Sequence, residues 1–369
     1  MEQENETPTA TVFQPQGSFE DLVEHFDSIP HYLFRTSSPQ SAGNTTETYI
    51  ESEAVKLNLD QRDLLRLDRA KAVAMLRNHL LWSKNHRSDN LISWTSSFLF
   101  AVQHGIRRQA TGHPYQEFSE IKISILDTRK VPRGTFLPAV ALLNAYGFKS
   151  QGRLAHKYYC GEYLSQGRLD LGGERGIMET TTLESFINHG LFELYPPFAD
   201  KNYETLLCSR VLQLREVFRS PPEVPNSEEI SLAQSISVGC FLDMSMRPVV
   251  MMTLLSLKPR FRLDTAILAA FRDNCWGTFV ADHSLDCYKA TSDQVPEHKQ
   301  LTDMMHDVHA DTQRKRQLDR TRAQWLKEKG TDLCQIEALA DSIAMRPTFQ
   351  KKYVVLVGRK GEEDYDSCG

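Results

Sequence analysis

The spacing of apolar residues changes near Pro196–Pro197, and this change constrains the fold more than any other feature of the chain. Before it, short apolar segments are separated by polar stretches. After it, apolar residues recur at helical spacing over long stretches. Because strands and helices bury different stripes of side chains, the change predicts two differently built regions. We therefore expect an α+β N-terminal domain, a mixed sheet with helices, followed by an α-helical C-terminal domain.

These patterns also set the expected boundaries. A disordered tail is expected over 1–18, an α/β domain over 19–200, a helical domain over 201–350, and a short strand with a polar tail over 351–369. In the first domain the predicted strands are 29–35, 91–97, 121–127, 158–164 and 177–182, and the predicted helices are 60–84, 97–108 and 138–146. In the second domain helices are predicted over 203–219, 228–257, 262–275, 298–329 and 333–345.

Charge and cysteine content exclude several classes of protein. The 43 Lys and Arg stand against 48 Asp and Glu, so the formal net charge of -5 gives no overall attraction to nucleic acid or to an anionic membrane. The stretch 314–329 is locally basic, but a solvated amphipathic helix is the expected structure, and nucleic acid is not the expected partner. The 7 cysteines are widely spaced without a C-x-x-C pair, which predicts neither a zinc site nor a disulfide framework. No metal is therefore expected.

Targeting signals are also missing from the sequence pattern. The first residues are acidic and polar, without the apolar segment of a secretory signal. The longest apolar run, 249–255, is far shorter than the roughly 20 residues that cross a bilayer. We expect a cytoplasmic or nuclear protein that is neither secreted nor bound to a membrane.

Three short segments each place a polar or charged residue on or beside a predicted strand, and their order along the chain is informative. Arg35 ends the apolar segment LFR on the first predicted strand, Ser93 begins S-W-T-S-S on the second, and Glu162 lies in G-E-Y-L-S-Q-G-R-L. Each has an ordinary explanation by itself. Arg35 and Glu162 would be exposed strand residues, and the hydroxyls of the second segment would cap the helix that follows.

In this order the segments resemble the arginine–serine–glutamate class of ADP-ribosyltransferases, the cholera-toxin-like enzymes. That family has an Arg on its first strand, then Ser-Thr-Ser, then a Glu followed by a glycine turn. Here the triplet beginning at Ser93 stands in for Ser-Thr-Ser, and Glu162 with Gly167 matches the Glu and its turn. The resemblance covers about residues 29–170. It implies an ADP-ribosyltransferase-like fold, NAD as substrate, and either ADP-ribosyl transfer or NAD hydrolysis.

The resemblance also implies roles for particular residues. The catalytic residues would be Glu162, Ser93 and Arg35, and the NAD-binding residues would be Arg35, Ser93, Thr95, Trp94 and Tyr163. Cleavage of the bond between nicotinamide and ribose builds positive charge on the sugar, which a carboxylate stabilises. A guanidinium can form two parallel hydrogen bonds to phosphate oxygens, and a hydroxyl can orient the side chains or the ribose beside it. Aromatic rings can stack on the flat nicotinamide ring.

Two further observations bear on the acceptor and on alternatives. Cys160 lies two residues before Glu162, where arginine-specific transferases carry an acidic residue or Gln, so the resemblance does not name arginine as acceptor. The sequence of residues 28–200 also resembles a family of uncharacterised fungal proteins. The alternatives to an enzyme of this class are a non-catalytic interaction protein that retains the fold and an accessory protein of a fungal secondary-metabolite pathway. The acceptor or partner is not named by any motif.

Overall fold

The computed structural model describes residues 12–59, 61–83, 89–172, 177–200, 205–274 and 293–328. The described residues up to Ala310 belong to one compact unit, and those from Asp311 belong to a second. The predicted helix 333–345 and the predicted segment 351–369 lie outside the described residues. No helix among the described residues has the length and apolar character needed to span a bilayer.

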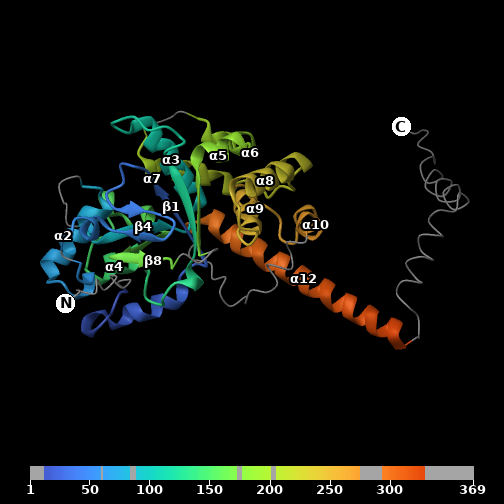
Figure 1. Ribbon diagram of the computed structural model, residues 1–369, viewed down its shortest axis with the longest axis horizontal. Coiled ribbons are helices and arrows are strands. Elements are labelled where there is room, and N and C mark those ends of the chain that lie inside the picture. Colours follow the sequence, from blue (N-terminus) through green and yellow to red (C-terminus); the bar gives the residue numbers. More distant parts are fainter. Residues whose placement is uncertain are drawn as a thin grey trace, which may run out of the picture. The chain divides into compact units, whose positions relative to one another are not determined.

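A six-stranded antiparallel sheet forms the centre of the N-terminal half (Figure 1). Its order is β6-β7-β4-β1-β5-β9, and a smaller antiparallel sheet has the order β2-β3-β8. The strands are β1 (Tyr32–Ser37), β2 (Asn44–Thr45), β3 (Tyr49–Glu51), β4 (Leu91–Thr95), β5 (Lys122–Asp127), β6 (Leu137–Pro138), β7 (Glu162–Gln166), β8 (Arg168–Asp170) and β9 (Met178–Thr182). The predicted α+β class is therefore confirmed, and the C-terminal half is helical as expected.

Several helices begin at side chains that cap them. The helices are α1 (Glu53–Lys56), α2 (Arg69–Leu80), α3 (Phe98–Thr111), α4 (Ala139–Ala145), α5 (Leu183–Asn188), α6 (Leu191–Leu194), α7 (Leu207–Arg215), α8 (Ser227–Cys240), α9 (Arg247–Leu255), α10 (Thr265–Asp273) and α12 (Pro296–Glu328), with a 3-10 helix η1 (Gly17–Ser28) before them. The Asp68 carboxylate accepts from the backbone N–H of Lys71 at the start of α2. Ser97 caps α3 in the same way. The helix predicted over 60–84 thus begins later than its apolar spacing indicates.

The two faces of the six-stranded sheet are covered differently. We call the face of Phe34 and Leu164 the helix face, since these side chains pack against helices, and the face of Trp94 and Tyr163 the small-sheet face. On the helix face, α3 and α5 cover β1 and β5, while α2, α4 and η1 cover β4 and β7. On the other face, Trp94 packs with apolar residues of the smaller sheet. Alternation of side chains along each strand produces this division.

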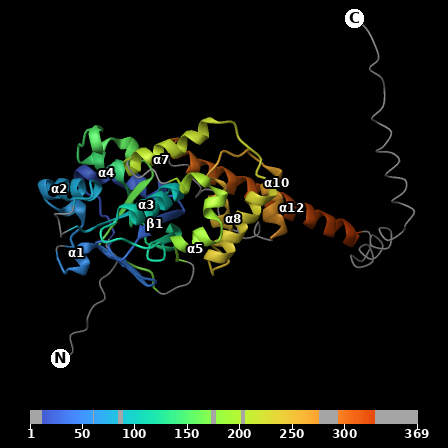
Figure 2. The same cartoon turned by 90° about the horizontal axis from the view of Figure 1, so that it is seen from above.

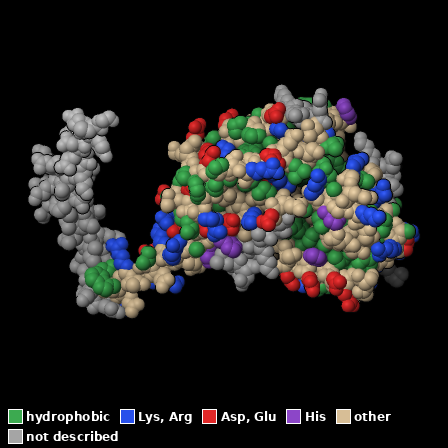
Figure 3. All heavy atoms as spheres, turned by 180° about the vertical axis from the view of Figure 1, so that it is seen from behind, with side chains coloured by type: hydrophobic (Ala, Val, Ile, Leu, Met, Phe, Trp, Pro, Cys, Tyr) green, Lys and Arg blue, Asp and Glu red, His purple; other side chains and the backbone are tan. Residues whose placement is uncertain are grey.

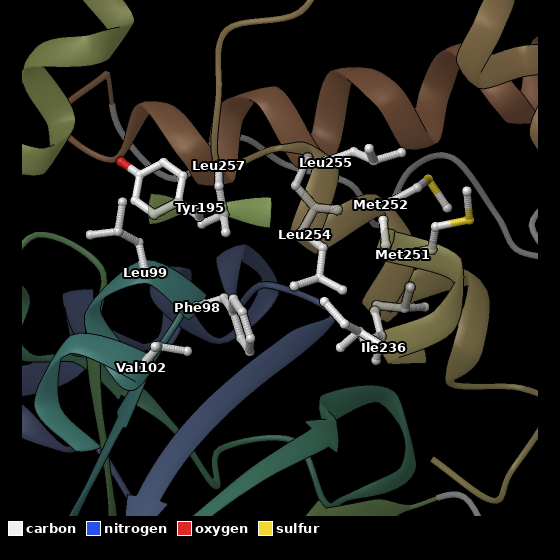
Figure 4. Packing of buried hydrophobic residues seen from close by; sticks show 14 of the residues in the cluster. Phe98, Leu99, Val102, Tyr195, Ile236, Met251, Met252, Leu254, Leu255 and Leu257 are labelled. Carbon is white, nitrogen blue, oxygen red and sulfur yellow. The ribbon is translucent and has the colours of Figure 1, made fainter. Parts of the chain in front are cut away.

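The helices of the C-terminal half share a core with the sheet. Phe98 and Val102 of α3 lie together with Ile236 of α8 and Leu254 of α9 in one buried cluster (Figure 4). In two perpendicular views, α2 and α10 lie at opposite ends of the first unit (Figures 1 and 2). On the face drawn in Figure 3, Lys and Arg side chains are interspersed with Asp and Glu.

The structure departs from the expected boundaries in two further places. The predicted tail over 1–18 includes Phe13, which is 2% exposed and whose N–H donates to the carbonyl of Gly134. The helix predicted over 228–257 is two helices, α8 and α9, which are separated at Phe241. Whether residues 19–200 fold without the later helices stays a prediction, because both parts contribute to the shared core.

Candidate active site

Ser93 and Glu162 lie next to each other on the helix face, where β4 pairs with β7. Thr95 and Glu162 are paired Cα partners, and the Ser93 hydroxyl donates to Oε1 of Glu162 at 2.8 Å. Gly161 turns the chain into β7 with φ of 86°, a conformation that favours glycine. The polar pair lies between two apolar clusters, one packed by α2 and α4 and the other by α3. The geometry therefore places a serine–carboxylate pair at the boundary between these two apolar clusters.

Two residues that the sequence motifs missed extend this pair into a chain. His79, in the last turn of α2, places Nε2 2.8 Å from the Ser93 hydroxyl. Its Nδ1 lies 2.5 Å from Oδ2 of Asp89, which comes just before β4. The result is the polar chain Asp89–His79–Ser93–Glu162, and we use this name for it below. No motif links a helix end to a strand start, so the sequence offered no signal for His79.

The hydrogen bonds of the polar chain determine the charge of His79. A serine hydroxyl has one proton, and Ser93 donates it to Glu162, so Nε2 of His79 must donate to Ser93. Asp89 accepts from Nδ1, and both ring nitrogens then carry protons. Burial by itself would lower the pKa of His79, but the Asp89 and Glu162 carboxylates raise it above its ordinary value. His79 is therefore a cation that faces two carboxylates.

Glu162 is a carboxylate under opposing influences. Burial raises the pKa of Glu162 above its ordinary value, and the hydrogen bond from Ser93 and the charge of His79 oppose this rise. A buried carboxylate that is held ionised by a cation through a hydroxyl can stabilise positive charge on a bound molecule. This is the chemical capacity of the pair.

Arg35 of β1 approaches Ser93 from the small-sheet face, where its guanidinium lies 5.9 Å from the centre of the Trp94 ring. Strands β1 and β4 are paired only at Phe34 and Thr95, and Nη1 of Arg35 donates to the Ser93 carbonyl at 2.8 Å. Its Nε lies 3.4 Å from the Thr45 hydroxyl. No carboxylate among the described residues forms an ion pair with Arg35. Burial and the neighbouring charge of Arg108 lower its pKa to about 10, so Arg35 stays cationic at neutral pH.

A second guanidinium and a neutral histidine accompany Arg35. Arg108 of α3 donates to the hydroxyls of Ser38 and Ser41, at 2.5 and 3.0 Å, and to Nε2 of His104 at 3.2 Å. Burial, Arg108 and Arg35 lower the pKa of His104 to about 3, so its imidazole is uncharged. His104 and Arg108 lie four residues apart on a predicted helix directly after S-W-T-S-S, and this spacing was the signal that could have found them.

The structure does not bring all the expected NAD-binding residues to the polar chain. Thr95 is 8% exposed, and its hydroxyl accepts from the backbone N–H of Ser97. Trp94 and Tyr163 are 1% and 3% exposed and lie on the small-sheet face, where the Trp94 indole donates to Ser165. A ring that is buried on both faces has no surface to stack a ligand. Trp94 therefore contacts the site only through Arg35, whose guanidinium lies 5.9 Å from the centre of its ring, whereas Tyr163 is among the residues that line the cavity beside Glu162.

Space for a small molecule exists beside Glu162. A cavity of about 530 Å³ is lined by Glu162, Gly161 and Tyr159 together with residues of η1 and α4. Its volume falls within the range of small-molecule sites. A second pocket of about 20 Å³ is lined by Thr95, Glu162 and Arg215. Among the described residues, His, Cys, Asp and Glu do not gather in a group of three or more that would hold a metal ion.

Comparison with known proteins adds one finding. Residues 28–171 match a family model described as Domain of unknown function (DUF7587). This part of the chain matches an uncharacterised family. The match runs from β1 to β8, and so it includes Arg35, Ser93 and Glu162. No curated protein and no solved structure matches the chain significantly. This family has no assigned activity, so the proposed function rests on the geometry of the site.

Proposed function

We propose that the chain cleaves NAD at Glu162, either transferring ADP-ribose to an acceptor or hydrolysing NAD when water is the acceptor. One observation carries the proposal. Arg35, Ser93 and Glu162 come from three different strands, and two hydrogen bonds of 2.8 Å join them through Ser93. These are the residues of the arginine–serine–glutamate pattern: Ser93 and Glu162 contact each other through their side chains, and Arg35 contacts the backbone of Ser93 from the small-sheet face.

The proposed reaction breaks the bond between the nicotinamide nitrogen and C1′ of the ribose. The bonding electron pair leaves with nicotinamide, and the sugar carbon becomes positively charged. The Glu162 carboxylate stabilises that charge, and Ser93 fixes the direction of the carboxylate. The acceptor then adds its electron pair to C1′ and loses a proton. Arg35 holds the pyrophosphate and so keeps the ribose in place.

The polar chain supports this role of Glu162. The carboxylate has to be ionised to stabilise a cation, although burial raises its pKa. The positive charge of His79, one hydroxyl away, opposes that rise, and Asp89 holds the imidazole in position. His79 and Asp89 are therefore positioning residues in the proposal, since neither touches the substrate.

The cavity beside Glu162 suits one half of the dinucleotide. Its volume of about 530 Å³ accommodates a nicotinamide ring with its ribose. The nicotinamide ring of NAD is a cation, and the Glu162 carboxylate that lines the cavity favours it there. The pyrophosphate would then lie at Arg35.

The decisive experiment compares two carboxylates of one sheet. The full chain, Glu162→Gln and Glu179→Gln are incubated with NAD labelled in the nicotinamide and in the adenylate. Free nicotinamide and labelled macromolecules are then measured. Loss of the Glu162 charge should reduce nicotinamide release by about 10²–10³-fold, as removal of comparable electrostatic groups does. Glu179 on β9 is also partly buried with a raised pKa, but it binds the backbone N–H of Asp243 and should be dispensable.

Three results would count against the proposal. No release by the full chain, unchanged release by Glu162→Gln, or equal losses in both variants would each remove Glu162 from the mechanism. NAD binding without turnover would instead favour a non-catalytic protein that retains the site.

A second candidate function rests on the distances around Ser93. Asp89, His79 and Ser93 have the order and spacing of a hydrolase triad, with contacts of 2.5 and 2.8 Å. Against this, Ser93 lies inside a strand rather than on a sharp turn, and its hydroxyl donates to Glu162 instead of His79. Labelling of Ser93 by a fluorophosphonate, retained in Glu162→Gln, would favour the hydrolase over the NAD-cleaving enzyme.

A further inference from the structure

An exposed tryptophan lies next to the polar chain. The Trp82 side chain is 55% exposed, although its backbone has φ of 52°, which bulky residues rarely adopt. Its N–H donates to the carbonyl of His79 at 3.0 Å, so it directly follows the helix turn that carries His79. Together with the N–H of Ser83, which donates to the carbonyl of Asn78, this bond forms the left-handed cap that ends α2, and the cap accounts for the positive φ. It does not account for the exposure of a large indole at this position.

One face of this indole rests on a flat, uncharged ring. Trp82 and His104 are stacked, with ring centroids 5.0 Å apart and planes inclined by 17°. Because burial and the adjacent guanidiniums of Arg108 and Arg35 keep His104 neutral, the stack does not place a cation against the indole. The imidazole therefore supports the indole from one side and leaves the remaining exposed surface available to another flat ring.

Two cations that form no ion pair with a carboxylate of the described residues lie near this stack. Arg108 contacts His104, and Arg108 lies near enough to Arg35 to lower its pKa. Hydroxyl or carbonyl oxygens and the His104 nitrogen are the acceptors of Arg35 and Arg108 in the described part of the chain. A pair of guanidiniums that repel each other is stabilised by a bound anion, and a phosphate fits their planar donors.

We propose that Trp82, His104 and Arg108 form the subsite for the adenylate half of a dinucleotide, with adenine stacked on Trp82 and its phosphate at Arg108 and Arg35. The identity of the dinucleotide as NAD rests on the proposed function above. Adenine is neutral, whereas the nicotinamide ring carries a positive charge that the two guanidiniums would repel. The charges thus assign the orientation: adenine lies at Trp82, the pyrophosphate lies at Arg35, and the nicotinamide riboside lies at Glu162.

The experiment measures binding without chemistry. Isothermal titration calorimetry measures the affinity of the full chain for AMP, for nicotinamide mononucleotide and for inorganic pyrophosphate. Trp82→Ala should weaken AMP about tenfold or more, because stacking on a base contributes at that level, and should leave pyrophosphate unchanged. Trp82→Phe should retain most of the AMP affinity. Arg108→Met should weaken both AMP and pyrophosphate, since it removes a phosphate contact.

A matched control is available in Trp325, whose side chain is also 55% exposed. Trp325→Ala should bind AMP as the unchanged chain does, and circular dichroism shows whether each variant is folded. The inference is overturned if AMP does not bind at millimolar concentration, if Trp82→Ala binds it normally, or if that variant loses nicotinamide mononucleotide instead. AMP binding that depends on Trp82, without any NAD cleavage, would keep the subsite and remove only the proposed reaction.

Discussion

The buried arginines of the helical half and those of the candidate site meet different partners. Arg215 of α7 forms a bidentate pair with Glu297 of α12, which is 3% exposed, with contacts of 2.8 to 3.1 Å. Arg260 is 4% exposed and pairs with Glu229 at 3.3 Å. Arg35 and Arg108 have no such carboxylate within the described ranges, and they share one neighbourhood.

This difference separates structural charges from charges that serve a ligand. A buried guanidinium is costly unless an anion or several strong acceptors meet it. In the helical half the chain supplies that anion itself, and Arg215 with Glu297 links α7 to the start of α12. At the candidate site Arg35 and Arg108 meet only neutral acceptors among the described residues, and burial together with the charge of Arg108 lowers the pKa of Arg35 to about 10. We infer that the missing negative charge comes from the substrate.

The largest predicted effect concerns the helical half. Arg215→Met should lower the free energy of unfolding by about 3–5 kcal/mol, because it leaves the buried Glu297 carboxylate without its cation. The matched variant Arg35→Met should lower it far less, since no carboxylate loses a partner. Urea denaturation followed by circular dichroism measures both. Equal losses in the two variants would mean that Arg35 is also a structural charge and that the contrast is wrong.

The second prediction tests the ligand side of the contrast. Arg35→Lys keeps the charge but loses the planar fork that matches a pyrophosphate. Affinity for ADP-ribose should fall about tenfold, while the melting temperature changes little. Titration calorimetry and a thermal melt report the two quantities independently. A large loss of melting temperature with unchanged affinity would contradict the role we give to Arg35.

The sequence was sufficient for the central elements of the fold because their patterns are local. Alternation of β-branched residues predicted β5, the segment LISWTSS after the Asp89–Asn90 turn predicted β4, and the segment 97–108 predicted α3. Local patterns fail where tertiary contacts decide. The N-terminal 3-10 helix η1 and the burial of Phe13 depend on contacts with segments more than a hundred residues away, such as Gly134.

The candidate site shows the same limit. A resemblance in residue order selected Arg35, Ser93 and Glu162, and the structure joins the side chains of Ser93 and Glu162 while Arg35 bonds to the Ser93 backbone from the opposite face. It also selected Trp94, whose neighbour Ser93 faces the opposite side of the sheet, because a motif does not state which face a residue occupies. His79 belongs to a helix whose register against β4 is a tertiary property, so no spacing rule reaches it.

The third prediction compares two buried histidines, one in each region. Burial lowers the pKa of His104 to about 3 and that of His298 to about 4, both below the ordinary value of 6.5. Below pH 6.5 the unfolded chain binds protons that the folded chain does not, so stability falls as the pH is lowered. The slope reaches about 1.4 kcal/mol per pH unit for each histidine. His104→Phe, which keeps a ring against Trp82, should make the decline shallower.

A ligand distinguishes the two histidines in that experiment. Pyrophosphate bound at Arg35 and Arg108 should weaken the repulsion between these guanidiniums and a protonated His104. The part of the acid-induced loss of stability that His104 causes should then become smaller. The decline caused by His298, which has Glu297 as its neighbour, should not respond. Denaturation curves between pH 4 and 7, with and without pyrophosphate, provide the comparison. An identical response in His104→Phe and in the unchanged chain would place the anion elsewhere.

The last and smallest effect concerns the charge of His79, which opposes the effect of burial on the pKa of Glu162. In His79→Gln the amide can still donate to Ser93, but the positive charge that faces Glu162 is lost. Because that charge opposes the rise that burial causes in the pKa of Glu162, its removal should raise this pKa further. The acid limb of the profile of kcat/KM against pH should therefore move to higher pH, while the rate on the plateau changes little. Asp89→Asn is the companion variant: it removes a carboxylate that raises the pKa of His79, so His79 loses its charge at lower pH and the acid limb should move to higher pH by no more than in His79→Gln. An acid limb that stays in place in His79→Gln would mean that His79 does not control the ionisation of Glu162.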